Sequence, residues 1–555
     1  MSTHEQGGED MLGGGRDGAT TGAVESSDEM RAASLDLPPE ELHSLARAFY
    51  DLTLDYISSP SALPVFPDTS AARLAEIFNL PLPAEGCELE SLERDCREVI
   101  RHSRQNGHPR MFGYIASPSA PAGALASLLA AALNVNVTSW RSAPAATAVE
   151  RTTVRWLAEL IGFAGAGVNE TCGGLLTSGG SMANLDALFV AHRAHSREAT
   201  HGVAQDASRG GTRDTSRGVA HDPSREGLWN AGAPATVYAS DQIHLSIPKA
   251  ADILGIGREH VRVVPSDERF RMDMRALRER IEADKAAGLR PFCVAASAGT
   301  VSTGAVDPLR EVARVARERN LWFHVDGAYG ALAASVEGKR ALFDGLTEAD
   351  SVSLDPHKWL YAPLDCGCLL FREPESARAA FAETEEGYIK VFERQEDEAF
   401  AFWDYGVELS RPFRALKVWA MLRYYGARRI AASIAEDCAL ADYLAGLVSA
   451  AEDFELLAPV ALGICCFRYV TARARRELEE ARDEEERERA GERLDELNAR
   501  VMQRVQRGGV AYVSNATLRG RFALRASITN FRTTRRDLRV TLDEVRRAAR
   551  EVEKE

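Results

Sequence analysis

The sequence lacks the features that mark zinc sites, disulfide frameworks, membrane spans and nucleic-acid binding. Its 555 residues include nine cysteines and no CxxC pair, which argues against a structural zinc site or a disulfide framework. The histidines show no metal-ligand spacing, so no metal site is predicted. No apolar run approaches about 18 residues, so no membrane-spanning helix is predicted. The net charge of −15 argues against nucleic acid and anionic membranes as partners, and a cytoplasmic location fits.

Three segments have a composition that cannot build a buried core. Residues 1–33 are rich in glycine and acids without a hydrophobic signal core, which predicts a disordered tail and no export signal. Residues 197–232 contain an eight-residue repeat rich in Gly, Ser, Arg and Asp, and we predict a disordered surface insert without a catalytic role. Residues 472–506 alternate arginine and glutamate at helical spacing, which is typical of a solvated helix with internal ion pairs.

The rest of the chain alternates strand-like and helical runs. Helical patterns cover residues 37–58, 88–105, 121–133 and 144–161. Short apolar strands are predicted at residues 236–239, 261–264, 292–296, 321–325, 351–354, 510–513 and 521–528. This alternation predicts an α/β fold with a mainly parallel sheet, whose chemistry belongs at the carboxyl ends of the strands.

Two predicted strands end in residues with a combined chemical meaning. One strand leads into Asp355-Pro356-His357-Lys358-Trp359, and another ends in Asp326-Gly327-Ala328-Tyr329. Upstream, Leu175 and Leu176 precede a Ser-Gly-Gly-Ser turn that opens a helix at about residue 182. A lysine that forms a Schiff base, an acid facing a pyridinium nitrogen and a helix N-terminus for a phosphate are what pyridoxal phosphate requires. The sequence therefore predicts a pyridoxal-phosphate enzyme.

On these motifs the chain resembles the pyridoxal-phosphate decarboxylases that act on aromatic L-amino acids, histidine and glutamate, and most of all the aromatic type. The resemblance extends from about Leu37 to about Val545. Besides the two strand ends, it rests on residues 240–246 (SDQIHLS), 108–114 (HPRMFGY) and 413–419 (FRALKVW). It implies a fold-type I enzyme with an N-terminal helical segment (34–120), a large cofactor domain (121–430) and a small C-terminal domain (431–555). It also implies a homodimer whose active site is completed across the subunit interface.

The resemblance assigns roles to individual residues. Lys358 would carry the cofactor, and Asp326 would pair with its ring nitrogen. His244 and Ala328 would cover the two faces of the ring, and Thr300 would approach its phenolic side. The residues that would hold the phosphate are Gly179, Gly180, Ser181, Ser353 and His357.

Further roles concern the substrate. Tyr388 falls where the family keeps a loop tyrosine that protonates the substrate carbon after carbon dioxide leaves, and Ser117 where the substrate carboxylate is held. Tyr114 is a further candidate substrate contact. Asn136 and Thr138 take positions at which animal dopa decarboxylases place an isoleucine and a phenylalanine against the substrate ring.

The polar character of Asn136 and Thr138 leaves the substrate open. An aromatic amino acid is the first expectation, and a polar one such as glutamate or diaminobutyrate is the alternative. Oxidation of the intermediate to an aldehyde, which Tyr388 argues against, and transamination are rival reactions on the same fold. A catalytically silent scaffold is the rival from another class, and the presence of Lys358, Asp326 and His244 argues against it.

Overall fold

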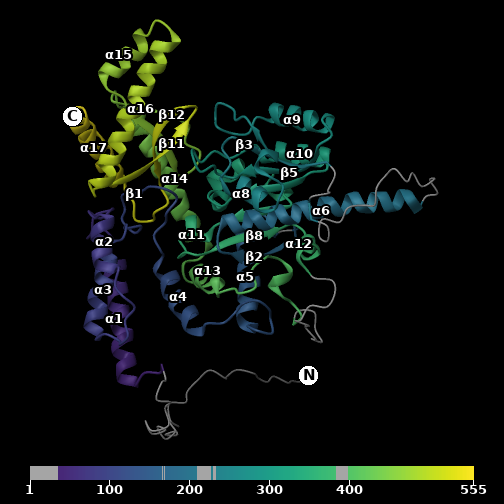
Figure 1. The fold of residues 1–555 in the computed structure, drawn as a ribbon, viewed down its shortest axis with the longest axis horizontal. Helices are drawn as coiled ribbons and strands as arrows, with labels where there is room; N and C mark the ends of the chain where they lie inside the picture. The colour runs from purple at the N-terminus through teal and green to yellow at the C-terminus, as the bar shows by residue number, and fades with distance from the viewer. Residues whose placement is uncertain (1–34, 166, 168, 209–226, 229–232, 383–397) are drawn as a thin grey trace, which may run out of the picture.

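A seven-stranded sheet forms the centre of the large domain in this computed structural model, which describes residues 35–165, 167, 169–208, 227–228, 233–382 and 398–555 (Figure 1). Its strands are β2 (Gly173–Thr177), β3 (Ala235–Ser240), β4 (Val261–Val264), β5 (Arg290–Ser297), β6 (Trp322–Asp326), β7 (Ser351–Leu354) and β8 (Gly367–Phe371). They lie in the order β2-β8-β7-β6-β5-β3-β4. Strand β8 is antiparallel to both of its neighbours, and all the other strands run in one direction. The predicted mainly parallel sheet is confirmed.

Helices cover both faces of this sheet. They are α5 (Pro144–Leu160), α6 (Gly180–Ser208), α8 (Ser246–Ile253), α9 (Met274–Ala286), α10 (Leu309–Arg319), α11 (Pro356–Trp359), α12 (Pro374–Phe381) and α13 (Arg414–Tyr425). Neighbouring strand residues point to opposite faces. Val237 and Cys293 therefore share one core with α6 and α8, whereas Tyr238 and Val294 share another with α9 and α10.

The C-terminal domain contains a smaller sheet that recruits a strand from the N-terminal segment. Its elements are α14 (Ala427–Ser449), β9 (Phe454–Leu456), β10 (Ile464–Tyr469), α15 (Ala472–Glu480), α16 (Glu484–Arg507), β11 (Tyr512–Leu518), β12 (Arg521–Ser527) and α17 (Arg535–Val552). The sheet order is β1-β11-β12-β10-β9, in which β1 (Met111–Phe112) pairs parallel to β11. This pairing ties the chain just before Tyr114 to the C-terminal domain.

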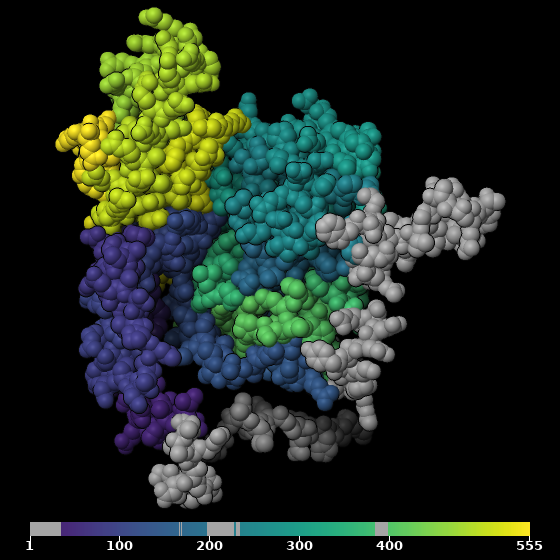
Figure 2. Space-filling model, viewed as in Figure 1, coloured from purple at the N-terminus to yellow at the C-terminus, as the bar shows by residue number. Residues whose placement is uncertain are grey.

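The N-terminal helices form a column along one side of the molecule, beneath the C-terminal domain (Figures 1 and 2). They are α1 (Pro39–Ser58), α2 (Ala71–Phe78) and α3 (Leu89–His102), and α4 (Pro121–Leu133) follows β1. Large apolar side chains stay exposed on these helices, among them Phe49, Tyr50, Leu128 and Leu129. No helix within the described part of the chain is long and apolar enough to cross a membrane.

Two segments differ from the sequence prediction. Helix α6 continues to Ser208, so the first part of the predicted disordered insert at 197–232 is helical; alanine, arginine and glutamate there favour a helix. The remaining insert residues 209–226 and 229–232, and the tail 1–33, lie outside the described residues. In 472–506 the chain forms α15 and α16 rather than one solvated helix. Leu494, Val501 and Val505 recur on one face of α16 and are buried, and the two valines belong to the core of the small sheet.

Candidate active site

Residues at the carboxyl ends of four parallel strands, β3, β5, β6 and β7, meet at one edge of the large sheet. A cavity of about 380 Å³ opens there. It is lined from the large domain by His244, Thr300, Asp326, Ala328 and Lys358. Its opposite wall comes from Tyr114 beyond β1 and from Ser514, Ala516 and Arg525 on the small sheet. The cavity therefore lies between the two domains, at the carboxyl ends where ligands bind in open α/β sheets.

Lys358 projects into this cavity from the short helix α11. Pro356 opens that helix, which directs the chain out of β7 and turns Lys358 back toward the strand end. The Lys358 Nζ lies 2.9 Å from Asp355 Oδ2, and the Asp355 side chain is only 2% exposed. Asp355 Oδ1 is also buried and has no hydrogen-bond partner among the described residues. The lysine thus stands at a buried carboxylate with unused acceptor capacity.

Asp326 ends β6 and is held by donors from three directions. Asn184 Nδ2 donates to Asp326 Oδ2 at 3.0 Å, and the Ala328 backbone N–H donates to Oδ1 at 3.2 Å. The Ser353 hydroxyl donates to Oδ1 at 3.4 Å. These three hydrogen bonds fix the orientation of the Asp326 carboxyl group at the cavity.

His244 follows β3 and lies at the same cavity. Its Nδ1 is 2.9 Å from Ser246 Oγ and accepts the Ser246 backbone N–H at 3.2 Å. Burial lowers the pKa of His244; Asp326 opposes that shift and Lys358 adds to it. The imidazole is therefore neutral at physiological pH.

The Ser178-Gly179-Gly180 turn joins β2 to the N-terminus of α6. A side-chain carbon at Gly180 would lie 2.8 Å from Ala328 Cβ and 3.1 Å from Asp355 Oδ2, so only glycine fits without displacement. At Gly179 such a carbon would lie 3.3 Å from His357 Cε1. The first backbone N–H groups of a helix lack intrahelical partners and favour an anion. This turn is a suitable cradle for a phosphate.

Several other predicted residues have structural partners. Thr300 lines the cavity and its hydroxyl lies 3.0 Å from that of Thr303; Tyr114 lines it with a half-exposed ring. Ser353 is fully buried, and its hydroxyl donates to Asp326 Oδ1 at 3.4 Å. The Ser117 hydroxyl donates to the Lys358 backbone carbonyl.

Asn136 and Thr138 have contacts elsewhere in the large domain. Asn136 Oδ1 accepts the Arg411 backbone N–H at 2.8 Å, and the Thr138 carbonyl accepts the Phe402 N–H at 2.8 Å. Neither side chain lines the Lys358 cavity of this chain. Ser181 is exposed in the first turn of α6. Tyr388 lies outside the described residues.

Comparison with known proteins identifies the family. The model of the pyridoxal-dependent decarboxylase conserved domain matches residues 72–233 and 231–470. An aromatic-L-amino-acid decarboxylase of Bacillus atrophaeus is 31% identical over 94% of this chain and 98% of its own length. The chain belongs to the pyridoxal-dependent decarboxylases.

A second similar protein and a similar solved structure are also found for this decarboxylase. A phenylacetaldehyde synthase of Petunia hybrida is 30% identical over 89% of this chain and 92% of its own length. The crystal structure of Oryza sativa TDC with PLP and tryptamine superimposes with a TM-score of 0.79 at 29% identity, covering 93% of this chain and 99% of that chain.

Pyridoxal phosphate is the cofactor of this decarboxylase, and the residues present fit it. Lys358 would supply the amine, Asp326 would face the ring nitrogen, and the Gly179-Gly180 turn would supply backbone donors to the phosphate. When bound, the cofactor withdraws electrons from the substrate Cα and weakens its bond to the carboxylate. The unpartnered Asp355 oxygen and the crowding that any larger residue would meet at Gly180 are what a site built for this group requires.

Sequence reasoning missed two residues of the site. Asp355 was given no role, although an acid three residues before a lysine lies beside it on one helical turn. Arg525 gave no sequence signal, because it is one of many arginines in the C-terminal region. Its Nη1 bonds Ser514 Oγ at 3.0 Å, whereas its Nε and Nη2 are buried without hydrogen-bond partners among the described residues.

Proposed function

We propose that this enzyme decarboxylates an aromatic L-amino acid to the corresponding amine and carbon dioxide. The observation that carries the proposal is Lys358 and Asp326 in one cavity that also has apolar walls. Ile115, Val301 and the ring of Tyr114 line it beside these charged groups. Such a mixture suits a ligand with a zwitterionic end and an aryl group. The relatives named as aromatic-L-amino-acid, tryptophan and tyrosine decarboxylases support the same substrate class.

The chain's own residues would position the substrate. Arg525 lines the cavity, and a guanidinium there suits a carboxylate; its Nε and Nη2 are buried without hydrogen-bond partners among the described residues. Neutral His244 can lie against the cofactor ring without adding a positive charge. Burial of the reacting carboxylate then favours its loss as neutral carbon dioxide, because the site replaces water around it.

A second candidate is decarboxylation of an acidic amino acid, and Arg525 is the observation that favours it. A guanidinium with unused donors can hold a side-chain carboxylate as readily as the α-carboxylate. Two carboxylates would then compete for one arginine. The substrate panel must therefore contain glutamate beside the aromatic amino acids.

The test is carbon dioxide release by the enzyme loaded with pyridoxal phosphate. The panel is tyrosine, dopa, tryptophan, phenylalanine, histidine, glutamate and diaminobutyrate, with amine, aldehyde and hydrogen peroxide measured in each reaction. We expect carbon dioxide and amine in equal amounts from at least one aromatic substrate. Release from glutamate or diaminobutyrate alone would replace the first proposal with the polar-substrate alternative. Aldehyde with hydrogen peroxide would indicate oxidative chemistry, and pyridoxamine phosphate with a keto acid would indicate transamination.

We also propose that the enzyme is a cytoplasmic homodimer. Phe49 and Tyr50 on α1 and Leu128 and Leu129 on α4 are exposed large apolar residues, which typically mark an interface. All nine cysteines are free, which suits a reducing compartment. Light scattering tests the assembly. We expect twice the chain mass for the wild type and a shift toward monomer in Leu128→Glu, with Leu82→Glu on another exposed leucine as the matched control.

A further inference from the structure

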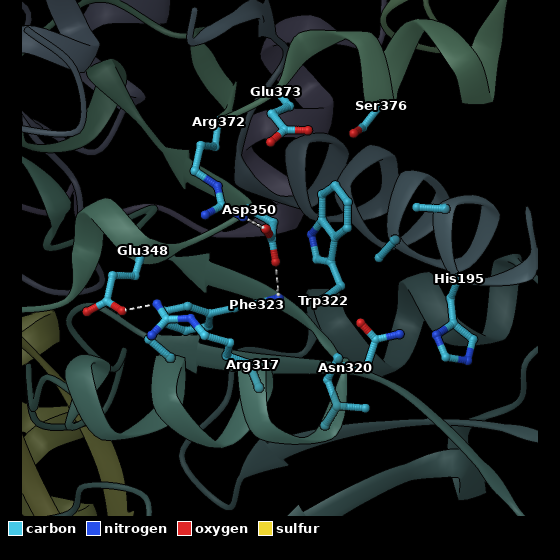
Figure 3. Close-up of a pocket in the computed structure, with 15 residues that line it drawn as sticks. His195, Arg317, Asn320, Trp322, Phe323, Glu348, Asp350, Arg372, Glu373 and Ser376 are labelled. Carbon is cyan, nitrogen blue, oxygen red and sulfur yellow. Dashed lines mark hydrogen bonds and ion pairs between the residues drawn. The ribbon is translucent and has the colours of Figure 1, made fainter. Parts of the chain in front are cut away.

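A continuous series of hydrogen bonds extends from the amino ends of β6 and β7 to the active site at their carboxyl ends. It begins at Trp322, whose ring lies at a second pocket on the opposite edge of the sheet (Figure 3). Trp322 Nε1 donates to Ser351 Oγ at 2.9 Å, and Ser351 Oγ lies 2.9 Å from His324 Nδ1. His324 Nε2 lies 3.0 Å from Asn184 Oδ1. The Asn184 amide nitrogen then bonds Asp326.

Asn184 also connects the series to His244. Its Nδ2 lies 3.0 Å from Asp326 Oδ2 and 2.8 Å from Ser246 Oγ, so both amide hydrogens have acceptors. Ser246 Oγ in turn contacts His244 Nδ1 at 2.9 Å. One buried amide on α6 thus holds the acid and the histidine that face the cofactor from different strands.

The donors and acceptors admit one arrangement of protons. An indole N–H can only donate, so Ser351 Oγ accepts from Trp322. Asn184 Nδ2 faces Asp326 Oδ2 and Ser246 Oγ, which leaves Asn184 Oδ1 facing His324 Nε2 as an acceptor. The proton of neutral His324 is therefore on Nε2, which donates to Asn184 Oδ1. The flipped amide would place its oxygen against the Asp326 carboxylate and its NH2 group against the His324 N–H, so the Asn184 nitrogen stays toward Asp326. The unprotonated Nδ1 of His324 then accepts the Ser351 hydroxyl.

The neutral state of His324 is part of this arrangement. Its side chain is fully buried in β6, and burial lowers its pKa to about 4 although nearby Asp326 raises it. A doubly protonated ring would donate from both nitrogens and reverse the Ser351 hydroxyl. At neutral pH each hydrogen bond in the series therefore keeps the same donor and the same acceptor.

We propose that Asn184 and His324 are positioning residues that hold Asp326 as the partner of the cofactor nitrogen and His244 as the Nε2–H tautomer. This inference rests on the proposed decarboxylase site and deepens it. His244 Nδ1 accepts the Ser246 backbone N–H at 3.2 Å and therefore carries no proton. The His244 proton then lies on Nε2. Neither positioning residue lines the cavity, so each acts through a residue that does.

The test uses full-length variants that remove or preserve the donors. Asn184→Leu removes the amide, His324→Leu removes the Nε2–H, and His324→Gln restores a donor of similar reach. Asn498→Leu is the matched control, since Asn498 is an equally buried amide that bonds the Tyr469 backbone in the C-terminal domain. Thermal unfolding and circular dichroism verify that each variant is folded. Ser351→Ala is a milder variant for use if both leucine variants fail to fold.

Two readouts report on the cofactor rather than on turnover. The first is the dissociation constant of pyridoxal phosphate, measured by quenching of tryptophan fluorescence. The second is the pH midpoint of the visible absorption of the bound cofactor, which reports the proton on its linkage to Lys358. A ring nitrogen that loses its carboxylate partner is less often charged, so the linkage holds its proton to higher pH.

We expect Asn184→Leu and His324→Leu to weaken cofactor binding by about tenfold or more and to raise the absorption midpoint by about 1 pH unit. His324→Gln should restore both values to near wild type, and Asn498→Leu should change neither. Wild-type affinity and midpoint in Asn184→Leu would overturn the proposal, as would equal losses in His324→Leu and His324→Gln or an equal loss in Asn498→Leu. Failure of the proposed function would show instead as normal cofactor spectra with no carbon dioxide from any amino acid.

Discussion

The buried ion pair between Arg411 and Glu150 allows a quantitative prediction about the strand that carries the phosphate turn. Both side chains are 1% exposed. Arg411 also donates to the carbonyls of Val137 and Leu176, each at 2.7 Å, and Glu150 Oε1 accepts the Leu176 N–H at 2.9 Å. Leu176 precedes the Ser178-Gly179-Gly180 turn by two residues. The pair therefore clamps the end of β2.

Replacing Arg411 with Met leaves the Glu150 charge buried without its partner. Breaking a buried pair in this way costs about 3–5 kcal/mol, and the two carbonyls also lose a donor. At an m value of about 3 kcal/mol per M, the urea midpoint should fall by about 1 M or more. Displacement of β2 should also weaken pyridoxal phosphate binding. Urea unfolding followed by circular dichroism, and cofactor titration, measure the two effects.

A second substitution isolates the charge as the cause. In Arg411→Met combined with Glu150→Gln, the amide oxygen still accepts the Leu176 N–H but carries no charge, so we expect the double variant to be more stable than Arg411→Met. Arg310→Met breaks the exposed pair with Asp344 and should barely move the midpoint. The reasoning is refuted if Arg310→Met and Arg411→Met cost the same, or if the double variant recovers nothing.

Three further predictions concern the site and its surroundings. Lys358→Ala should abolish carbon dioxide release and the visible absorption of the bound cofactor while the fold is kept; residual turnover would contradict its role. Gly180→Ala should weaken cofactor binding at least about tenfold, because its methyl group would lie 2.8 Å from Ala328 Cβ and 3.1 Å from an Asp355 oxygen; unchanged affinity would contradict the packing argument. Burial raises the pKa of Asp437 from 3.8 to about 7, so the folded state retains a proton that the unfolded chain releases. Wild-type stability should therefore fall as pH rises from about 4 to above 7, relative to Asp437→Asn, by up to about 4 kcal/mol. The measurement is the free energy of unfolding of both proteins at about pH 5 and about pH 8.5. An equal change between the two pH values in wild type and Asp437→Asn would contradict this.

Much of the fold and the chemistry could be predicted from local sequence. The strands ending near Asp326 and Lys358 were predictable because apolar runs of strand length, separated by helical patterns, have few other ways to bury their side chains. Their direction followed from the same alternation, and parallel strands place their carboxyl ends at one edge. The Ser178-Gly179-Gly180 turn was predictable because a glycine pair between a strand and a helix permits a tight turn.

Contacts between distant segments were decided only by the tertiary structure. The pairing of β1 with β11 brings Tyr114 to Arg525, and no local pattern encodes a contact across about four hundred residues. The local sequence gives Arg525 and Asn184 no special role, because their donors are buried near the cavity only by tertiary contacts. The sequence alone thus determined the cofactor and predicted Lys358 as the residue to bind it, because that chemistry needs few residue types in fixed local settings. Burial and hydrogen-bond direction depend on packing between elements, so the walls of the cavity and the groups that orient Asp326 and His244 were decided by the folded chain.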